Sequence, residues 1–195
     1  MTDREHYTPG PANGAHVRKD RGQNNEEKWT LILVRELSHA PEKVWLAITD
    51  PVHLREWAPF DADGSLGITG ATAKLTTVGA PAPHVTETTV TRADAPNVLE
   101  YKWSGFDMRW ELEAFGSGTR LTLWTNIGHR FIAMGAAGWH ICFDVLDRLL
   151  SGTPIGRIVG PEAMKFGHWQ RLNAEYAKQF GLETPNWPPQ AVQKS

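Results

Sequence analysis

Two helix starts stand in immediate succession at residues 40–57, and this feature constrains the fold more than any other. Proline fits the first turn of a helix because its missing N–H group has no intrahelical partner there, so Pro41 and Pro51 each predict a start. Asp50 precedes the second proline and belongs to the residue types that cap free N–H groups. The sequence therefore predicts two short helices joined head to tail, with Trp45 and Trp57 on their inner side.

Strand-like segments lie on both sides of this helix pair. One precedes it and five follow a linker at residues 58–70; the candidates span residues 28–37, 71–78, 84–92, 98–103, 107–115 and 119–127. Turns such as Ser104-Gly105 tolerate the positive φ angles of tight hairpins, so the last five strands are expected to form a sequential antiparallel meander. The helix pair is then expected to close one end of this curved sheet around a cavity.

Alternation along the strands predicts one apolar and aromatic sheet face. Its members alternate with charged residues of the opposite face: Leu99, Tyr101 and Trp103 on one strand, and Met108, Trp110 and Leu112 on the next. On the last strand, Leu121 and Leu123 are expected to point inward, and the pattern alone leaves the face of Trp124 open.

The apolar period becomes helical at residues 131–150. A wide apolar band is expected to lie across the sheet; it includes Met134, Trp139, Cys142, Phe143 and Leu146. Asp144 and Arg148 fall on the outer side, where their spacing of four residues favours a surface ion pair. A glycine-rich connection then leads to a final amphipathic helix at residues 161–180.

The length and composition predict one domain of the α+β class. A chain of 195 residues with 41% hydrophobic and 22% charged residues is long enough for one sizeable core, which we place at residues 28–182. Residues 1–27 are polar and predict a flexible segment, in which residues 15–18 are a candidate edge strand. Residues 183–195 are predicted to be a flexible tail.

Charge and composition exclude several classes of partner. A net charge of -2 provides no long-range attraction to nucleic acid or to anionic lipid. No run of about 18 apolar residues is present to enter a membrane, and the polar N-terminus is not a secretion signal. The single cysteine, Cys142, agrees with a reducing compartment, so we expect a cytoplasmic protein.

The sequence contains no motif for metal binding or catalysis. The eight histidines show no His-Glu-x-x-His spacing, and no Gly-x-Ser-x-Gly motif occurs. Cys142 falls on the apolar band of the long helix, where a buried thiol is unreactive. We therefore predict no metal ion, no other cofactor and no catalytic residue, with His140 as the only candidate if the protein is an enzyme.

The order of a strand, two short helices, an antiparallel meander and a long helix resembles the SRPBCC superfamily, which includes START and birch-pollen-allergen-like proteins. Within it, the chain is similar to the branch named for the C-terminal domain of the heat-shock-protein-90 ATPase activator. The matching residues are Pro41, Val44, Trp45, Asp50, Pro51, Leu54, Trp57, Leu99-Glu100-Tyr101-Lys102-Trp103, Thr119-Arg120-Leu121-Thr122-Leu123, Gly138-Trp139 and Leu146. The helical motif is the more specific part of the resemblance.

The resemblance implies a helix-grip fold, in which a curved sheet wraps around a long helix and leaves an elongated cavity between them. It also implies that the protein binds a hydrophobic or amphipathic small molecule, since most members do, whereas a minority catalyse cyclisation or hydrolysis. The N-terminal segment and the last helix depart from the family pattern. Each is a candidate cover for the cavity mouth or for a partner surface.

We hypothesise that the cavity binds a small hydrophobic or aromatic molecule without transforming it. The candidate ligand-binding residues are Trp57, Phe60, Tyr101, Trp103, Met108, Trp110, Met134, Trp139, His140 and Phe143. Trp57 and Phe60 are the expected gate residues, because the cavity of this fold normally opens near the second short helix. Tyr101 or His140 is expected to orient the ligand. The tryptophans are equally compatible with an ordinary core, and the plainer interpretation of His140 is a helix-border histidine paired with Asp144.

Two other functions stay open. A cyclase, aromatase or hydrolase on the same fold would need a proton-transfer group inside the cavity, for which His140 with Asp144 is the candidate. A chaperone-partner role is suggested only by the family name, and a fold does not confer the activity of its best-known member.

Overall fold

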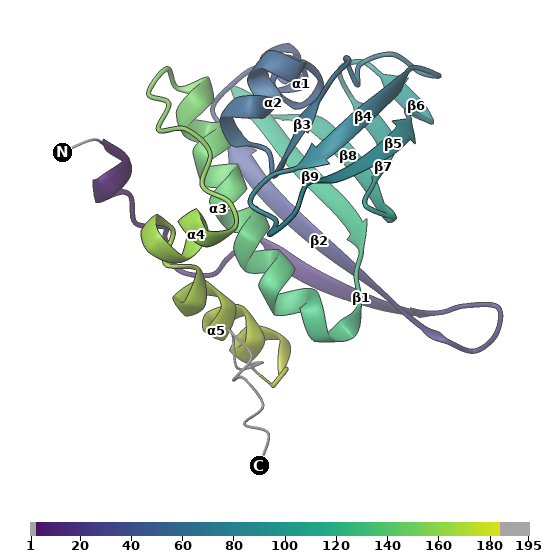
Figure 1. The fold of residues 1–195 in the computed structure, drawn as a ribbon, viewed down its shortest axis with the longest axis vertical. Coiled ribbons are helices and arrows are strands. Elements are labelled where there is room, and N and C mark those ends of the chain that lie inside the picture. The colour runs from purple at the N-terminus through teal and green to yellow at the C-terminus, as the bar shows by residue number, and fades with distance from the viewer. Residues whose placement is uncertain (1–2, 184–195) are drawn as a thin grey trace.

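A computed structural model describes residues 3–183 and shows a curved antiparallel sheet wrapped around one long helix, α3 (Ile132–Leu150) (Figure 1). The main sheet has six strands in the order β1, β2, β9, β8, β7, β6. Their bounds are Ala15–Arg21, Glu27–Leu37, Gly118–Asn126, Phe106–Phe115, Val98–Trp103 and Arg92–Asp94. This architecture confirms the α+β helix-grip fold.

The two short helices form where the prolines predict them, as α1 (Pro41–Thr49) and α2 (Pro51–Trp57). The Asp50 carboxylate accepts hydrogen bonds from the backbone N–H groups of Val52 and His53, at 2.9 and 3.3 Å. These bonds pair two of the N–H groups that a helix start leaves free. The pair packs against one end of α3, as Figure 1 shows.

Strands β7, β8 and β9 follow one another as antiparallel hairpins, and β9 then pairs with β2. Leu121 and Leu123 are fully buried, which confirms the predicted inward face of β9. Trp124 lies on the other face, where the Arg18 guanidinium is 5.6 Å from the centre of its ring. The structure thus answers the question that alternation left open.

The predicted five-strand meander is wrong in one respect, because its first two strands belong to a second sheet. There β4 (Thr72–Thr77) pairs with β5 (His84–Thr89) and with β3 (Phe60–Ala62), a short strand inside the predicted linker. Strand β5 runs beside β7, but the hydroxyls of Thr88 and Thr86 accept the N–H groups of Lys102 and Ser104. Side-chain acceptors therefore replace the backbone ladder that a continuous sheet would need.

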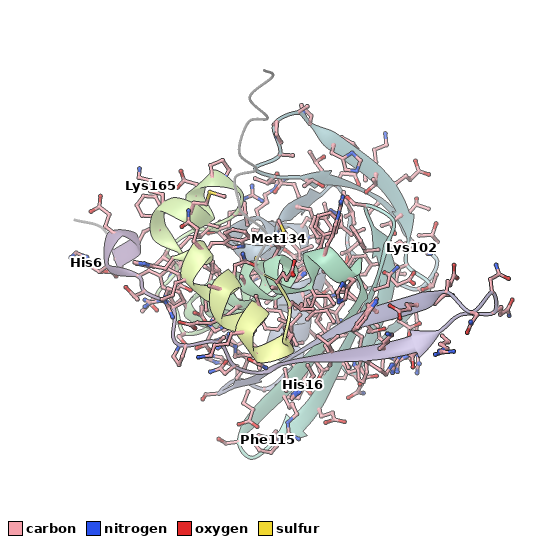
Figure 2. The ribbon with its side chains drawn as sticks, turned by 90° about the horizontal axis from the view of Figure 1, so that it is seen from below. His6, His16, Lys102, Phe115, Met134 and Lys165 are labelled. Atoms are coloured by element: carbon pink, nitrogen blue, oxygen red, sulfur yellow. The ribbon has the colours of Figure 1, made fainter. Side chains whose placement is uncertain are left out.

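Helix α3 is covered on both sides, by the sheet and by α5 (Trp169–Phe180) (Figure 2). Asp144, predicted on the outer side with Arg148, pairs instead with Arg35 of β2 at 3.0 Å. The phenol of Tyr7 donates a hydrogen bond to the same carboxylate at 2.7 Å. The predicted surface ion pair is therefore wrong, because the N-terminal segment covers this face of the helix.

The N-terminal segment packs against the domain that the sequence predicts to start at residue 28. Its candidate edge strand forms as β1 and extends to Arg21. Tyr7 is only 4% exposed and joins the core, after a short 3₁₀ turn at Asp3–His6. The predicted flexible tail, residues 183–195, lies outside the described residues except for its first position.

The predicted final helix is two helices, α4 (Pro161–Phe166) and α5. His168 adopts a left-handed conformation with φ of 50°, which breaks the helical path. At Gly167 a Cβ would approach the side chain of Ile141 in α3 to 2.6 Å. Glycine is thus needed where this connection crosses the long helix, and the break turns Trp169 toward α3.

Candidate functional site

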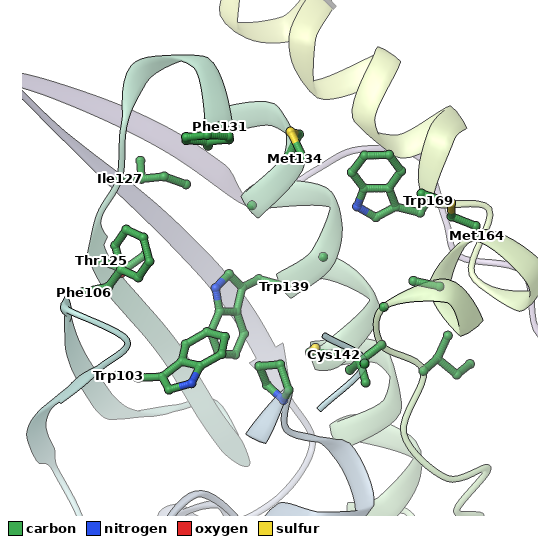
Figure 3. A pocket seen from close by; sticks show the side chains of 18 of the residues that line it. Trp103, Phe106, Thr125, Ile127, Phe131, Met134, Trp139, Cys142, Met164 and Trp169 are labelled. Atoms are coloured by element: carbon green, nitrogen blue, oxygen red, sulfur yellow. The ribbon is translucent and has the colours of Figure 1, made fainter. Parts of the chain in front are cut away.

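A cavity of about 630 Å³ lies between the main sheet, α3 and the segment from residue 158 to 169 (Figure 3). Its lining residues come from four regions and are almost all apolar. They are Trp103, Phe106, Met108, Thr125, Asn126 and Ile127 from the sheet and its end; Phe131, Met134, Gly135, Gly138, Trp139 and Cys142 from α3 and the turn before it; Ile158, Val159, Gly160, Pro161, Ala163, Met164 and Trp169 from the C-terminal segment; and Pro59, Gly79 and Pro81 from loops.

The α3 wall contains a row of small residues, Gly135, Gly138 and Cys142, on one face of the helix. A Cβ placed on Gly138 would have no atom within 4 Å, so the cavity is open directly above it. A Cβ on Gly135 would approach Ile127 to 2.6 Å, so the space there is already filled. Glycine inside a helix destabilises it by about 1 kcal/mol relative to alanine. Gly138 therefore keeps room in the cavity at a cost in stability.

Aromatic rings form one side of the cavity. Trp103 and Trp139 meet edge to face, with ring centres 6.0 Å apart, and Trp110 supports Trp139 from behind at 5.6 Å. Phe106 and Phe131 also line the cavity and are about 40% exposed, so they mark its open side. Figure 3 shows Trp103 and Trp139 on one side of the pocket and Met164 and Trp169 on the other.

The C-terminal wall is held in place by a close backbone contact and an ion pair. Gly79 and Gly160 both have positive φ angles, and a Cβ on Gly160 would approach the carbonyl oxygen of Gly79 to 2.7 Å. Next to this contact, the Arg157 guanidinium binds both carboxylate oxygens of Asp61, at 2.7 and 3.3 Å. The wall is thus fastened to the loop after β4 and to β3, across the cavity from α3.

The cavity wall carries no charged side chain among the described residues. Burial raises the pKa of the Cys142 thiol to about 12, so the thiol is neutral and a poor nucleophile near pH 7. The hydroxyl of Thr125 donates to the sulfur of Met108 at 3.6 Å. Within residues 3–183, no group of three His, Cys, Asp or Glu side chains is arranged to hold a metal ion.

Four of the ten predicted site residues lie on the cavity wall: Trp103, Met108, Met134 and Trp139. Tyr101, Trp110 and Phe143 lie behind it in the core, where the indole N–H of Trp110 donates to the Tyr101 hydroxyl at 3.2 Å. Tyr101 therefore does not reach the cavity to orient a ligand. Alternation correctly predicts the inner face, but it cannot say which part of that face stays uncovered.

The expected gate residues do not lie at the cavity mouth. Trp57 and Phe60 are each 1% exposed, and neither lines the cavity. The indole N–H of Trp57 donates to the carbonyl of Ala47 at 2.9 Å, which locks the end of α2 onto α1. The ring of Phe60 packs against Trp103 at 5.2 Å, so it supports the wall from behind. The correction follows from the second sheet, because β3 draws Phe60 into the core.

Sequence reasoning missed the glycine row of α3 and the wall at residues 158–169. The signal for the first was present, since Gly135 and Gly138 interrupt an otherwise strongly helical, apolar stretch. The second had no signal, because the approach of this segment to Gly79 is a contact between distant parts of the chain.

A sequence model of one family, described as "Activator of Hsp90 ATPase homolog 1-like protein" (AHSA1), matches residues 38–151. The chain belongs to this family. The match confirms the resemblance to the SRPBCC superfamily, and it covers the helix pair, both glycines of the α3 wall and Cys142. The AHSA1 match ends before the wall formed by residues 158–169.

Solved structures share the fold of this AHSA1-like chain. CalU16 from Micromonospora echinospora is 19% identical with a TM-score of 0.60, and the match covers 84% of this chain and 95% of that one. The conserved protein of unknown function EF2215 from Enterococcus faecalis is 19% identical with a TM-score of 0.60, covering 86% and 92%. An AHSA1-like protein from Aeromonas hydrophila is 19% identical with a TM-score of 0.52, covering 63% and 92%. A comparison with curated proteins finds no match.

His140 of this AHSA1-like chain lies on the side of α3 that faces α5, away from the cavity lining. Its Nδ1 is 2.8 Å from the hydroxyl of Tyr176, which donates its proton to the carbonyl of Asn13 at 2.7 Å. The same hydroxyl accepts the backbone N–H of Asn13 at 3.2 Å, and the Nε2 atom of His140 is 3.6 Å from the Asp144 carboxylate. This cluster fastens the N-terminal segment to α3 and α5.

Burial, as the largest cause, lowers the pKa of His140 below its usual value, and the charges of Arg35 and Arg171 act in the same direction. Asp144 and Glu175 oppose the shift. The unfolded chain therefore binds a proton at His140 near pH 6.5, whereas the folded chain binds it only at a lower pH. Protonation of His140 does not affect stability well above pH 6.5, and it lowers the free energy of unfolding as the pH falls below that value.

We expect the free energy of unfolding to decrease below about pH 6.5, by at most about 1.4 kcal/mol per pH unit from this group. Urea unfolding between about pH 7.5 and 5.5 measures the slope. His140→Gln should flatten it, whereas His84→Gln, at an exposed position, should leave it unchanged. Equal slopes for the wild type and His140→Gln would contradict the assignment.

Proposed function

We propose that this protein binds a small hydrophobic or aromatic molecule in the cavity between the sheet and α3, without transforming it. The observation that carries the proposal is the open apolar cavity of about 630 Å³ above Gly138. This volume lies within the range of about 300–1,000 Å³ that is usual for small-molecule pockets. Burial of apolar ligand surface stabilises a complex by about 25 cal/mol per Å², so a ligand that fills the cavity would bind without any charged contact.

Binding is favoured over catalysis by the chemistry of the wall. His140, the candidate for proton transfer, faces Tyr176 instead of the cavity. The Cys142 thiol is held neutral by burial. The cyclase, aromatase and hydrolase alternatives need a group that moves a proton beside the ligand, and no lining residue favours them. His140→Gln that lost turnover on an identified substrate would revive them.

The chaperone-partner alternative rests on the family description alone. A fold hosts many functions, so the description does not carry the activity to this chain. The partner that we propose is the small molecule itself, and a cytoplasmic location stays a prediction. No helix of residues 3–183 has the length and apolar character needed to cross a bilayer. A reproducible pull-down of the chaperone would argue for the alternative.

The direct test is native mass spectrometry of freshly purified protein, followed by extraction of whatever co-purifies. A mass increase that disappears on denaturation is the expected result. Titration with Nile red, an uncharged aromatic dye, then measures cavity binding whether or not a natural ligand is retained. Failure of both measurements would overturn the proposed function.

Substitution of the aromatic wall provides a second test. Trp103→Ala and Trp139→Ala each remove a ring that lines the cavity, and we expect Nile red to bind at least about 10-fold more weakly. Trp124→Ala is the matched control, because Trp124 lies on the opposite face of the sheet, under Arg18. It should change the dissociation constant by less than about twofold. Equal effects at all three positions would count against the cavity as the binding site.

A further inference from the structure

Two tryptophans on the cavity wall have indole N–H groups without a hydrogen-bond acceptor. They are Trp139 of α3 and Trp169 of α5, and no described residue accepts from either Nε1. Both rings are nearly buried, at 7% and 8% exposed. Each ring is thus nearly enclosed, but its Nε1 atom is not, so the N–H group is accessible to an acceptor atom of a ligand.

Three other tryptophans, of which Trp103 also lines the cavity, pair their N–H groups with protein atoms. Trp57 donates to the carbonyl of Ala47, Trp103 to the hydroxyl of Thr77 and Trp110 to the hydroxyl of Tyr101. Trp124 also has no partner at Nε1, but that atom is completely covered on the outer sheet face. The Nε1 atoms of Trp139 and Trp169 are not covered in this way, because both rings border the open cavity (Figure 3).

The other lining residues indicate that the cavity favours an uncharged ligand. No lining side chain among the described residues is ionised, so a charged ligand would lose its hydration without gaining a counter-ion. Asn126 adds another donor, because its side-chain oxygen already accepts the N–H of Asp107 at 2.6 Å and its amide NH₂ group is left. The wall thus offers side-chain N–H donors at Trp139, Trp169 and Asn126, besides the hydroxyl oxygen of Thr125 as an acceptor.

We propose that the cavity selects an uncharged aromatic ligand whose carbonyl or ether oxygens accept hydrogen bonds from Nε1 of Trp139 and of Trp169. The aromatic part packs against the rings of Trp103, Trp139 and Phe106, and the oxygens pair the two donors. This inference rests on the proposed function, and it adds the chemical class of the ligand and the atoms that recognise it.

The test uses three probes with one carbon skeleton: fluorene, fluorenone and fluorene carboxylate. Fluorenone adds one acceptor to fluorene, and the carboxylate adds a charge. Isothermal titration of the full chain gives a dissociation constant for each. Fluorenone is expected to bind about 3- to 10-fold more tightly than fluorene, because its carbonyl oxygen accepts a hydrogen bond. The carboxylate is expected to bind at least about 10-fold more weakly than either.

Tryptophan-to-phenylalanine variants isolate the N–H group, because they keep an aromatic ring. Trp139→Phe, Trp169→Phe or both should lower the preference for fluorenone over fluorene by about 3- to 10-fold, the effect expected of one hydrogen bond. Fluorene is expected to bind each variant more weakly than the wild type, because phenylalanine offers a smaller ring to the ligand, and its retained binding shows that the variant is folded. Trp45→Phe, away from the cavity lining, is the control and should leave the preference unchanged.

The outcomes separate the two proposals. An unchanged preference for fluorenone in both variants, or tightest binding of the carboxylate, would overturn the ligand class while the cavity stayed a binding site. Absence of binding by Nile red and all three probes would overturn the proposed function itself. A reduced preference in either variant, with fluorene binding retained, supports the assignment.

Discussion

Replacement of Gly138 with leucine is expected to abolish ligand binding while the protein stays at least as stable as the wild type. The position lies in the middle of α3, where leucine is a better helix former than glycine by roughly 0.8 kcal/mol. A Cβ there meets no atom within 4 Å, so the side chain enters the cavity instead of clashing with the protein. Nile red and fluorene should bind at least about 100-fold more weakly, because the leucine occupies the volume that they need. Isothermal titration and urea unfolding measure the two effects.

Two variants serve as controls for this prediction. Gly138→Ala adds one methyl group and should raise stability by about 1 kcal/mol while weakening binding only slightly. Gly135→Leu should be less stable than Gly138→Leu, because its Cβ would have to displace the end of the Ile127 side chain, 2.6 Å away. Retained binding by Gly138→Leu, or its destabilisation by more than about 2 kcal/mol, would show that the space above Gly138 is not the site.

The largest loss of stability is expected from Asp144→Ala. The Asp144 carboxylate pairs with Arg35 at 3.0 Å and accepts the phenol proton of Tyr7 at 2.7 Å. The side chains of Asp144 and Arg35 are 16% and 22% exposed, so removal of the carboxylate leaves a largely buried cation unpaired. Breaking a fully buried pair costs about 3–5 kcal/mol; with this partial exposure we expect about 2–3 kcal/mol. Urea unfolding at neutral pH measures the change.

Asp147→Ala is the matched control, since Asp147 lies three residues further along α3 and is exposed. Its effect should stay within about 0.5 kcal/mol. The double variant Arg35→Met with Asp144→Leu removes both charges and should be less destabilised than Asp144→Ala. A similar loss for Asp144→Ala and Asp147→Ala would contradict the role of the ion pair in holding the N-terminal segment against α3.

The helices and strands that depend on interactions between neighbouring residues were predictable from the sequence. Pro41, Pro51 and Asp50 act within a few residues of themselves, so the positions of α1 and α2 followed directly. Alternation on β7 and β8 and the helical period of α3 are likewise properties of short windows. The fold class followed because these elements occur in the order that one family shares, and the AHSA1 match over residues 38–151 confirms it.

The candidate site was predictable only in part, because a cavity forms where no side chain fills the space between the sheet and the helices. Trp103 and Trp110 both occupy inward-facing positions on neighbouring strands, yet only Trp103 lines the cavity. Trp110 is covered by Trp57, Trp139 and Phe143, which come from two different helices. No periodicity in the sequence distinguishes a covered inner residue from an uncovered one.

The sequence by itself therefore determined the helices α1, α2 and α3, the apolar faces of β7, β8 and β9, and the family to which the chain belongs. Only the tertiary structure decided that β3 and the N-terminal segment draw Phe60 and Tyr7 into the core. It also decided that residues 158–169 form the wall opposite α3. The physical reason is range: caps, turns and periodicity act between near neighbours, whereas the cavity depends on contacts such as that between Gly79 and Gly160, which are distant in the chain.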